Sequence, residues 1–260
     1  MKPVVILGCG PAGLFAAQAI KEAGGHPIIH SAKKKSPIFG AQFLTRPIPG
    51  LTLPSPDMVE SVRLGTKERY AQRVYGESAT PSTWADAKHW QEPAWNMQAA
   101  YDHAWDVFEA DIVDMKLDSH DVEEMTAFFP LVISTIPQWS ICKGGHAFES
   151  ISILITKECL YDHKEAENLV VYNGTQEDGW YRSSVVFGQP STETVASDRS
   201  HLFFSGESNY ESGFKIVGND CDCHPNLVRA GRMGTWKRGV LTGHAYEAAI
   251  AAYVESTNVT

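Results

Sequence analysis

The chain has 260 residues, of which 43% are hydrophobic and 20% charged, and its formal net charge is −9. This composition is typical of a globular protein with a real core, long enough for one domain or two. The negative charge argues against broad, non-specific binding to nucleic acid, although local clusters of Lys and Arg remain. The sequence has no apolar run near the length of a membrane span and no secretion-signal pattern, so we expect a cytoplasmic protein without a membrane partner.

The five cysteines do not form the pattern of a disulfide framework, because their number is odd and only Cys221 and Cys223 are close in sequence. Cys221-Asp222-Cys223-His224 contains metal-binding residue types, but no second ligand pair stands at a suitable spacing. A metal site needs three or four assembled ligands. We therefore predict no metal.

The N-terminal segment has the pattern of a nucleotide-binding turn. An apolar run predicts a buried strand, the glycines of G-x-G-x-x-G follow it, and a helical pattern comes next. Gly8 would make the tight turn, Gly10 would let the backbone approach a pyrophosphate, and Gly13 would let helix and strand pack closely. Pro11 and Ala12 would lie at the helix N-terminus, where free N–H groups and the helix dipole favour an anion. The alternative is a glycine turn without a ligand.

The position that distinguishes cofactors departs from this pattern. In dinucleotide folds an acidic residue at the end of the second strand hydrogen-bonds the adenosine ribose. Here that position, in the strand 26–31, falls on Ser31 or His30, and neither is a carboxylate, although Ser31 can still bond a ribose hydroxyl. Lys33 and the lysines after it could instead meet a 2′-phosphate.

Hydrophobic periodicity predicts the remaining elements. Helices are expected over 55–75, 94–108 and 120–126, followed by a C-terminal alanine-rich helix that ends near 254. Strands are expected over 112–117, 131–137, 146–157, 168–173, 180–188 and 201–206, and loops over 36–56 and 76–93. The run 131–137 suits a buried parallel strand whose tip meets a ligand, whereas the runs between 146 and 188 indicate a small antiparallel sheet.

Three segments together resemble the FAD-binding fold of the glutathione-reductase-like flavin oxidoreductases, which include amine oxidases and UDP-galactopyranose mutase. They are the glycine turn at 8–13, the run 133–137 and a C-terminal glycine loop at 231–242. The resemblance implies an α/β fold: a Rossmann-like FAD-binding domain, with a parallel sheet and helices, interrupted by a small α+β substrate domain. It implies an FAD-binding domain at 1–40, 131–137 and 201–260, and an inserted substrate or cap domain at 41–130 and 138–200.

The same resemblance implies which residues hold FAD. The segment 232–235 looks like the C-terminal flavin loop of the mutase, and a helix N-terminus at 239–241 would stabilise negative charge on the reduced flavin. The segment 40–42 matches a loop that meets the flavin ring. A structural loop before an amphipathic helix is the alternative. The predicted cofactor residues are Gly8, Gly10, Pro11, Ala12, Gly13, Ser31, Lys33, Gly40, Gln42, Thr135, Pro137, Arg232, Gly234, Trp236, Lys237, Gly239 and Val240.

A narrower resemblance rests on segments 38–42, 46–50, 180–184 and 231–242, which are similar to small FAD-dependent proteins encoded by tailed bacteriophages. Some of these belong to thymidine hypermodification pathways, in which a flavin lyase trims an amino acid such as glycine on the thymine methyl carbon of viral DNA to an aminomethyl group. The resemblance implies oxidation of a C–N bond in an amine or amino-acid-like substrate, or in modified DNA that presents a flipped thymine derivative. The protein would then work in the cytoplasm of the host cell.

The resemblance also implies catalytic roles for three residues. Arg182 or Arg46 would clamp a substrate carboxylate in bidentate fashion, and Tyr181, beside Trp180, would wall the pocket. His244 has the position of a packed or solvent-facing histidine rather than a base. Two other classes of function stay open: a reductase that binds NAD(P)H directly, and a non-catalytic dinucleotide-binding module. The sequence carries no signal for an oligomeric state.

Overall fold

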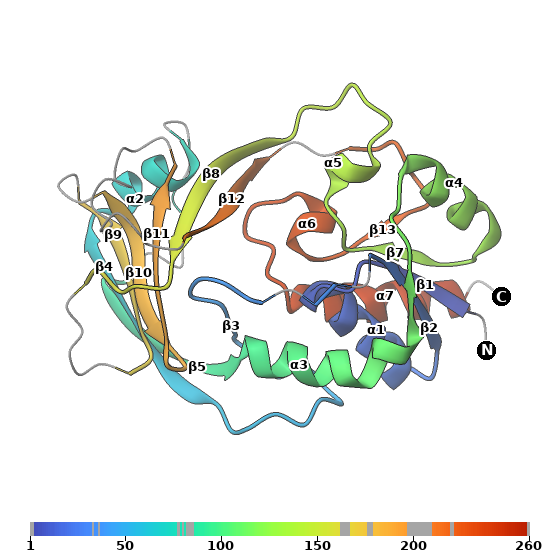
Figure 1. Cartoon of the computed structure of the whole chain (residues 1–260), viewed down its shortest axis with the longest axis horizontal. Coiled ribbons are helices and arrows are strands. Elements are labelled where there is room, and N and C mark those ends of the chain that lie inside the picture. Colours follow the sequence, from blue (N-terminus) through green and yellow to red (C-terminus); the bar gives the residue numbers. More distant parts are fainter. Residues whose placement is uncertain are drawn as a thin grey trace.

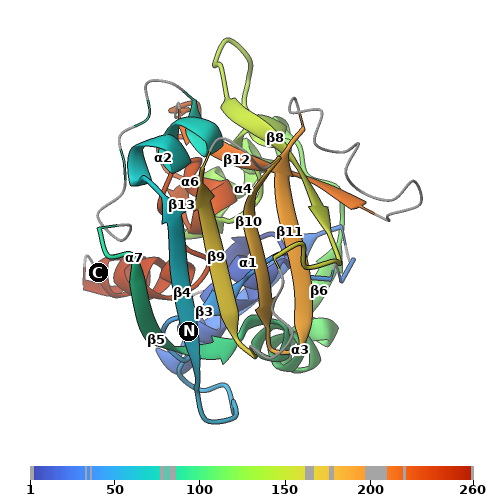
Figure 2. The ribbon, with the colours of Figure 1, turned by 90° about the vertical axis from the view of Figure 1, so that its left-hand side faces the viewer.

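The computed structural model describes residues 3–32, 34–35, 37–76, 79, 81, 86–161, 167–175, 179–196, 210–218 and 221–258. These residues form two parts, each built around one sheet (Figure 1). One part contains a five-stranded parallel sheet between helices. The other is an eight-stranded mixed sheet with a single helix, α2, packed against it (Figures 1 and 2).

The parallel sheet has the strand order β13-β7-β1-β2-β6, and every neighbouring pair in it is parallel. Its strand β1 is buried on both faces, because Val4 and Ile6 belong to one apolar cluster and Val5 and Leu7 to another. Burial on both faces explains why the sequence here is a continuous apolar run. The bounds are β1 Pro3–Leu7, β2 His26–Ser31, β6 Ile112–Asp114, β7 Val132–Ser134 and β13 Val228–Arg229.

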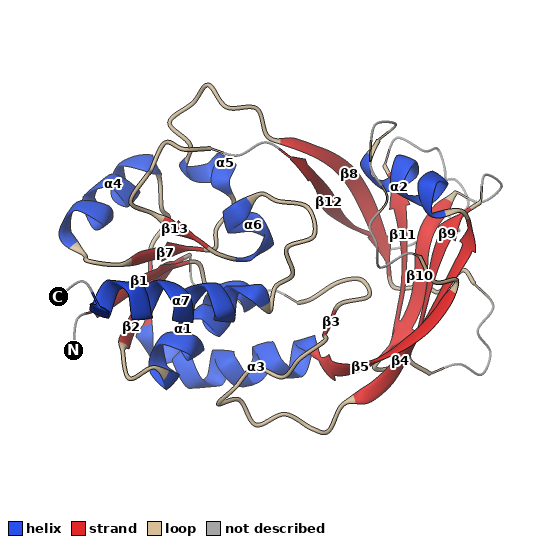
Figure 3. Ribbon diagram, turned by 180° about the vertical axis from the view of Figure 1, so that it is seen from behind, coloured by secondary structure: helices blue, strands red, loops and turns tan. Residues whose placement is uncertain are grey.

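Helices cover both faces of this sheet, as Figure 3 shows from behind. On one face lie α1 (Pro11–Glu22), α3 (Met97–Phe108) and α7 (His244–Asn258). On the other lie α4 (Ser119–Phe128) and α5 (Gln138–Ile141). A short 3-10 helix, η2 (Glu109–Asp111), follows α3, and α6 (Gly231–Thr235) follows β13.

The larger sheet has the order β12-β8-β11-β10-β9-β4-β5-β3, and its pairs are antiparallel except β4 with β9. Its helix, α2, spans Lys67–Tyr75. The strands are β3 Phe43–Leu44, β4 Asp57–Gly65, β5 His89–Asn96, β8 Glu149–Thr156, β9 Leu169–Gly174, β10 Trp180–Val186, β11 Gln189–Val195 and β12 Tyr210–Gly218.

Several predicted elements are confirmed, namely α3, α4, β7 and the strands β8, β9 and β10. The helix predicted over 55–75 is wrong in its first half, where β4 occupies 57–65. Val59 and Ser61, two positions apart, are both buried, as expected for one face of a strand. The helix begins only after Gly65, with Thr66 as its N-cap. The sheet is neither small nor wholly antiparallel. The predicted strand 201–206 lies outside the described residues.

The two sheets do not follow the predicted domain boundaries at two strands. β6 joins the parallel sheet although 41–130 was assigned to the inserted domain, and β12 joins the larger sheet although 201–260 was assigned to the FAD-binding domain. The cause is that β6 pairs with β2 in regular register, and that β12 pairs with β8 along its length, with one irregularity between Ile216 and Gly218. In the described part of the chain, the helices are too short or too polar to cross a membrane.

Candidate active site

The glycine turn between β1 and α1 has the geometry that the sequence predicts. Gly8 has φ 107°, its N–H donates to the carbonyl of His30 at 2.9 Å, and a Cβ there would lie 2.7 Å from Thr135 Oγ1. A Cβ on Gly13 would collide with the Gly8 carbonyl, so α1 packs directly on the turn. At Gly10 a Cβ would have no atom within 4 Å. The turn therefore has no room for a side chain at Gly8 or Gly13, whereas the space beside Gly10 is open.

The N-terminus of α1 is an electrostatically positive end that side chains leave uncapped. Gly10 is its N-cap, no side chain caps it, its first turn has no acidic residue, and Pro11 stands at the first position. The N–H groups of Ala12 and Gly13 find no carbonyl within the helix, because the first turn has no preceding turn to bond. Such an end favours a bound anion.

The C-terminal glycine loop meets this turn. A Cβ on Gly231, which has φ 68°, would lie 2.7 Å from the Cβ of Ala12. Gln138 Nε2 donates to the Gly234 carbonyl at 2.8 Å, and Thr135 Oγ1 donates to the Leu7 carbonyl at 2.9 Å. The structure thus brings together the three segments that the sequence singled out, at 8–13, 133–137 and from 231 onward. Pro137 is the N-cap residue of α5.

After α6 the loop turns toward the larger sheet. Trp236 has φ 48°, is 2% exposed, and packs against Phe148 and Phe214, with ring centroids 5.5 and 5.4 Å away. Its indole Nε1 has no hydrogen-bond partner among the described residues. Arg232 Nε donates to the Val240 carbonyl at 3.3 Å.

The end of this loop differs from the prediction. α7 begins at His244, not at 239–241, and the His244 imidazole is exposed and accepts a hydrogen bond from the Leu241 N–H at 3.2 Å. Gly239 has φ 82° and open space around it, which turns the chain before the helix. Lys237 is exposed.

A buried charge cluster lies under the loop at Gly40. Glu193 of β11 forms ion pairs with Arg182 of β10 and, at 2.9 Å, with Lys215 of β12, and it accepts a hydrogen bond from Tyr181 at 2.5 Å. The Glu193 side chain is 2% exposed. A Cβ on Gly40 would lie 2.7 Å from Glu193 Oε1 and 3.6 Å from Arg182 Nη2. The predicted flavin-ring loop therefore rests on this cluster.

The cluster carries more positive than negative charge. Burial by itself would raise the pKa of Glu193, but Arg182 and Lys215 hold that pKa well below its ordinary value. Burial and the charge of Arg182 lower the pKa of Lys215 to about 8, against the opposing effect of Glu193. Burial and then Arg182 also lower the pKa of Arg232, so this guanidinium is near enough to be repelled. Three cations surround one carboxylate, which is an arrangement that can hold an anion.

Two predicted catalytic residues have other positions. Tyr181 has no exposed surface, so its ring packs in the core and its hydroxyl supports Glu193 instead of lining a pocket. Arg46 has a side chain that is 82% exposed, and it pairs with Glu247 on α7 at 3.2 Å. Arg182 lies in the cluster, but one of its terminal nitrogens is taken by Glu193. Its buried Nε has no hydrogen-bond partner among the described residues, so a role for Arg182 in a carboxylate clamp stays a prediction.

A carboxylate, Asp114, is in register with the end of β2, where the adenosine ribose is predicted to bind and where β2 itself has no acidic residue. Ser31, at the end of β2, is in register with Asp114 of β6. The acid absent from β2 thus has a counterpart on the neighbouring strand. Gln42 is exposed, and its amide donates to the Phe39 carbonyl at 2.6 Å. Lys33 lies outside the described residues.

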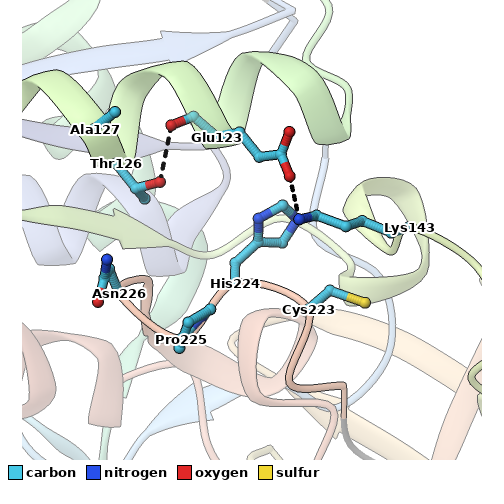
Figure 4. Close-up of a pocket in the computed structure, with 8 residues that line it drawn as sticks. All are labelled: Glu123, Thr126, Ala127, Lys143, Cys223, His224, Pro225 and Asn226. Atoms are coloured by element: carbon cyan, nitrogen blue, oxygen red, sulfur yellow. Dashed lines mark hydrogen bonds and ion pairs between the residues drawn. The ribbon is translucent and has the colours of Figure 1, made fainter.

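A surface hollow of about 310 Å³ lies elsewhere, between α4 and the segment 223–226 (Figure 4). Glu123 and Lys143 form an ion pair at its rim. None of the predicted cofactor or catalytic residues lines it. Its neighbour Cys223 belongs to a group of four side chains, with Cys142, His146 and Cys221, whose ligand atoms lie within 4.8 Å of one another. The spacing argument against a metal therefore fails, because the fold supplies the second ligand pair.

The fold is Rossmann-like α/β with a second, β-rich part, as the sequence predicts. No family model matches the chain, and no curated protein matches it. Solved structures do. A reduced UDP-galactopyranose mutase matches with TM-score 0.59 and 11% identity, over 100% of this chain and 96% of that one.

Two further structures match with TM-score 0.51. A variant of 2-methyl-3-hydroxypyridine-5-carboxylic acid oxygenase is 13% identical, with 100% of this chain and 82% of that one covered. A flavoprotein/dehydrogenase from Cytophaga hutchinsonii is 14% identical, with 99% and 78% covered. At such identities the likeness establishes the fold.

Proposed function

We propose that this protein is an FAD-dependent enzyme that oxidises a C–N bond in an amine that also carries an anionic group, such as an amino-acid-like substrate. One observation carries the proposal. The segment at Gly231 packs on the open glycine turn, and its next residue, Arg232, has a pKa lowered by burial and then by the charge of Arg182 in the buried cluster. An anion site for a cofactor and an anion site for a substrate are thus joined by one segment. The fold shared with a mutase, an oxygenase and a flavoprotein/dehydrogenase supports FAD as the cofactor.

The residues present fit the dinucleotide. The first turn of α1 and Gly10 would receive the pyrophosphate, and Ser31 with Asp114 would serve the adenosine ribose. The partnerless indole N–H of Trp236 is a buried donor that an acceptor on the cofactor would satisfy. When bound, FAD supplies a two-electron acceptor for the oxidation.

The chain's own residues would bind and deprotonate the substrate. Arg182 and Arg232 would attract its anionic group, since these two guanidinium groups outnumber the one carboxylate of Glu193 even when Lys215 is neutral. Lys215 Nζ would accept a proton from the substrate ammonium, because a buried lysine with a pKa of about 8 is neutral in a large fraction of molecules near that pH. Glu193 would position both groups through its ion pairs.

The resemblance to phage proteins supports a more specific substrate: DNA in which the thymine methyl carbon carries a glycyl group. The enzyme would trim this group to an aminomethyl group. The net charge of −9 means that only a local basic surface would contact the DNA. A base flipped out of the duplex into a pocket needs basic residues only around that pocket, so a net charge of −9 is compatible with this substrate.

The first experiment is the absorbance spectrum of the purified protein. Flavin bands, or FAD binding on reconstitution, are expected, and a colourless protein that cannot be reconstituted would refute the proposal. The second is incubation with DNA that carries a glycyl-modified thymidine, with free amino acids in parallel. Aminomethyl product from the DNA, together with peroxide formed when O₂ accepts the two electrons of the oxidation, would support the lyase assignment. Turnover of a free amine alone would move the substrate class to small molecules.

A further inference from the structure

Cys142, His146, Cys221 and Cys223 present four ligand atoms to one point in space. Cys142 Sγ lies 3.9 Å from Cys223 Sγ and 3.3 Å from His146 Nδ1, and Cys223 Sγ lies 3.5 Å from the same nitrogen. All four ligand atoms are within 4.8 Å of one another. No disulfide joins the three cysteines among them.

These separations match the edges of a zinc tetrahedron. Zinc bonds of 2.3 Å to sulfur and 2.0–2.1 Å to nitrogen place two sulfurs about 3.8 Å apart and sulfur about 3.6 Å from nitrogen. The measured Sγ–Sγ and Sγ–Nδ1 distances lie within a few tenths of an ångström of these values. A disulfide does not explain the arrangement, because its sulfurs would have to be about 2.05 Å apart.

Groups around the four side chains orient them as metal ligands are oriented. His146 directs Nδ1 to the sulfurs, while its Nε2 is 3.2 Å from a carboxylate oxygen of Asp222. A carboxylate on the outer nitrogen fixes the tautomer and raises the basicity of a ligating histidine. The Gly144 N–H donates to Cys142 Sγ at 3.4 Å, which stabilises a thiolate. Gly144 and Gly145, with φ 104° and 86°, turn the chain so that His146 comes back to Cys142.

The four residues stand on two connections that join the two parts of the fold. Cys142 and His146 lie between α5 and β8, and Cys221 and Cys223 lie between β12 and β13. β8 and β12 pair side by side, so both connections leave the larger sheet together (Figure 1). The Cys221 N–H also donates to Gln138 Oε1 at 3.1 Å, and Gln138 in turn donates to the Gly234 carbonyl.

We propose that these four side chains bind one zinc ion, in a closed structural site that joins the two connections. Four protein ligands leave no open position for water or substrate, which is the mark of a structural and not a catalytic zinc site. Three thiolates and one imidazole in tetrahedral array select zinc over magnesium or calcium, which prefer oxygen ligands. The site is independent of the cofactor. Gln138 links the site to the loop at Gly234, because it accepts a hydrogen bond from the Cys221 N–H and donates one to the Gly234 carbonyl.

Metal analysis of the purified wild-type chain, without added chelator, tests the site directly. One zinc per chain is expected. Removal of the zinc and addition of Co²⁺ to the reduced protein should give the visible bands of a tetrahedral thiolate site. Cys142→Ser and Cys223→Ser should each abolish stoichiometric zinc. The matched control is Cys159→Ser, since that thiol contacts Tyr161 and Ser183 and lies outside the cluster; it should keep the zinc.

Asp222→Asn tests the site without touching a ligand. Asp222 is 96% exposed, so the fold should tolerate the change, and loss of the outer carboxylate should weaken zinc affinity about 10- to 100-fold. This variant also covers the case in which the cysteine variants fail to fold. The proposal is overturned by a chain that neither contains zinc nor binds Zn²⁺ or Co²⁺ when reduced. Iron in the site overturns the zinc assignment, as does zinc that survives both cysteine substitutions.

Discussion

Replacement of Gly10 by aspartate should separate folding from cofactor binding. Gly10 has φ −69° and ψ 175°, a conformation open to any residue, and a side chain there would meet no atom within 4 Å of its Cβ. The position is also the N-cap of α1, where aspartate is among the favoured residues. The apo protein should therefore fold as well as the wild type, while a bound pyrophosphate would meet a negative charge.

The two effects differ greatly in size. Gly and Asp at an N-cap differ by only a few tenths of a kcal/mol, and for a chain of this size that corresponds to a Tm shift of about 1 °C. A carboxylate about 4 Å from one phosphate charge is repelled by about 4 kcal/mol at an effective dielectric constant near 20. Since each 1.4 kcal/mol is tenfold, the Kd for FAD should rise by about a thousandfold.

Titration of the apo protein with FAD, followed by flavin fluorescence, measures this Kd, and thermal unfolding of the apo protein measures the stability. Gly10→Asn has nearly the same size without the charge, so the difference between the two variants isolates electrostatics from crowding. Gly218→Asp, at another glycine with open space, controls for charge elsewhere. An unchanged Kd for Gly10→Asp, with a folded protein, would show that no phosphate lies at the start of α1.

Three further changes probe the buried groups. Glu193→Gln should destabilise the fold by about 3–5 kcal/mol at pH 7, because it leaves buried cations without their partner. The pKa of Glu193 is lower in the folded than in the unfolded protein, so ionised Glu193 stabilises the fold above pH 4.5 and does so less and less below it. Urea unfolding from pH 3 to 7 should therefore show the free energy of unfolding fall steeply with acid in the wild type and less steeply in the variant. Turnover by the wild type should rise with pH through about 8, as Lys215 loses its proton. Lys215→Met should still bind FAD but should not show this rise. If the variant keeps the wild-type pH profile, Lys215 is not the base. Trp236→Phe should lower apo stability modestly, because the smaller ring leaves space in a buried site, and should weaken FAD binding about tenfold, because the indole N–H is lost. Equal FAD affinity would remove Trp236 from the cofactor site.

The sequence predicts most of the half that contains the parallel sheet, because its signals are local. The glycine turn, the run 131–137 and the helix at 97–108 are each set by spacings within one segment. β4 escapes prediction since Glu60, Ser61 and Arg63 weaken its alternation, and its pairing with β5 and β9 decides its conformation.

The buried charges and the thiol cluster cannot be predicted in this way. Glu193 meets Lys215 from another strand, and Cys142 meets Cys223 across 81 positions of sequence. Such contacts depend on sheet order and on the course of two connections, which no local periodicity encodes. One weak signal existed: a carboxylate at Glu193 within a short strand that is otherwise uncharged requires a buried partner when that strand is internal.

The order of strands in the parallel sheet has a consequence for how the protein is made. β1 and β2 are synthesised long before β13, α6 and α7, which complete the sheet, the loop at Gly231 and the cover over α1. During synthesis the glycine turn is exposed without the segment that closes it. A cofactor bound as proposed would therefore be held only after β13 and α6 have been made, and any truncation before β13 removes the loop on which both proposed anion sites depend.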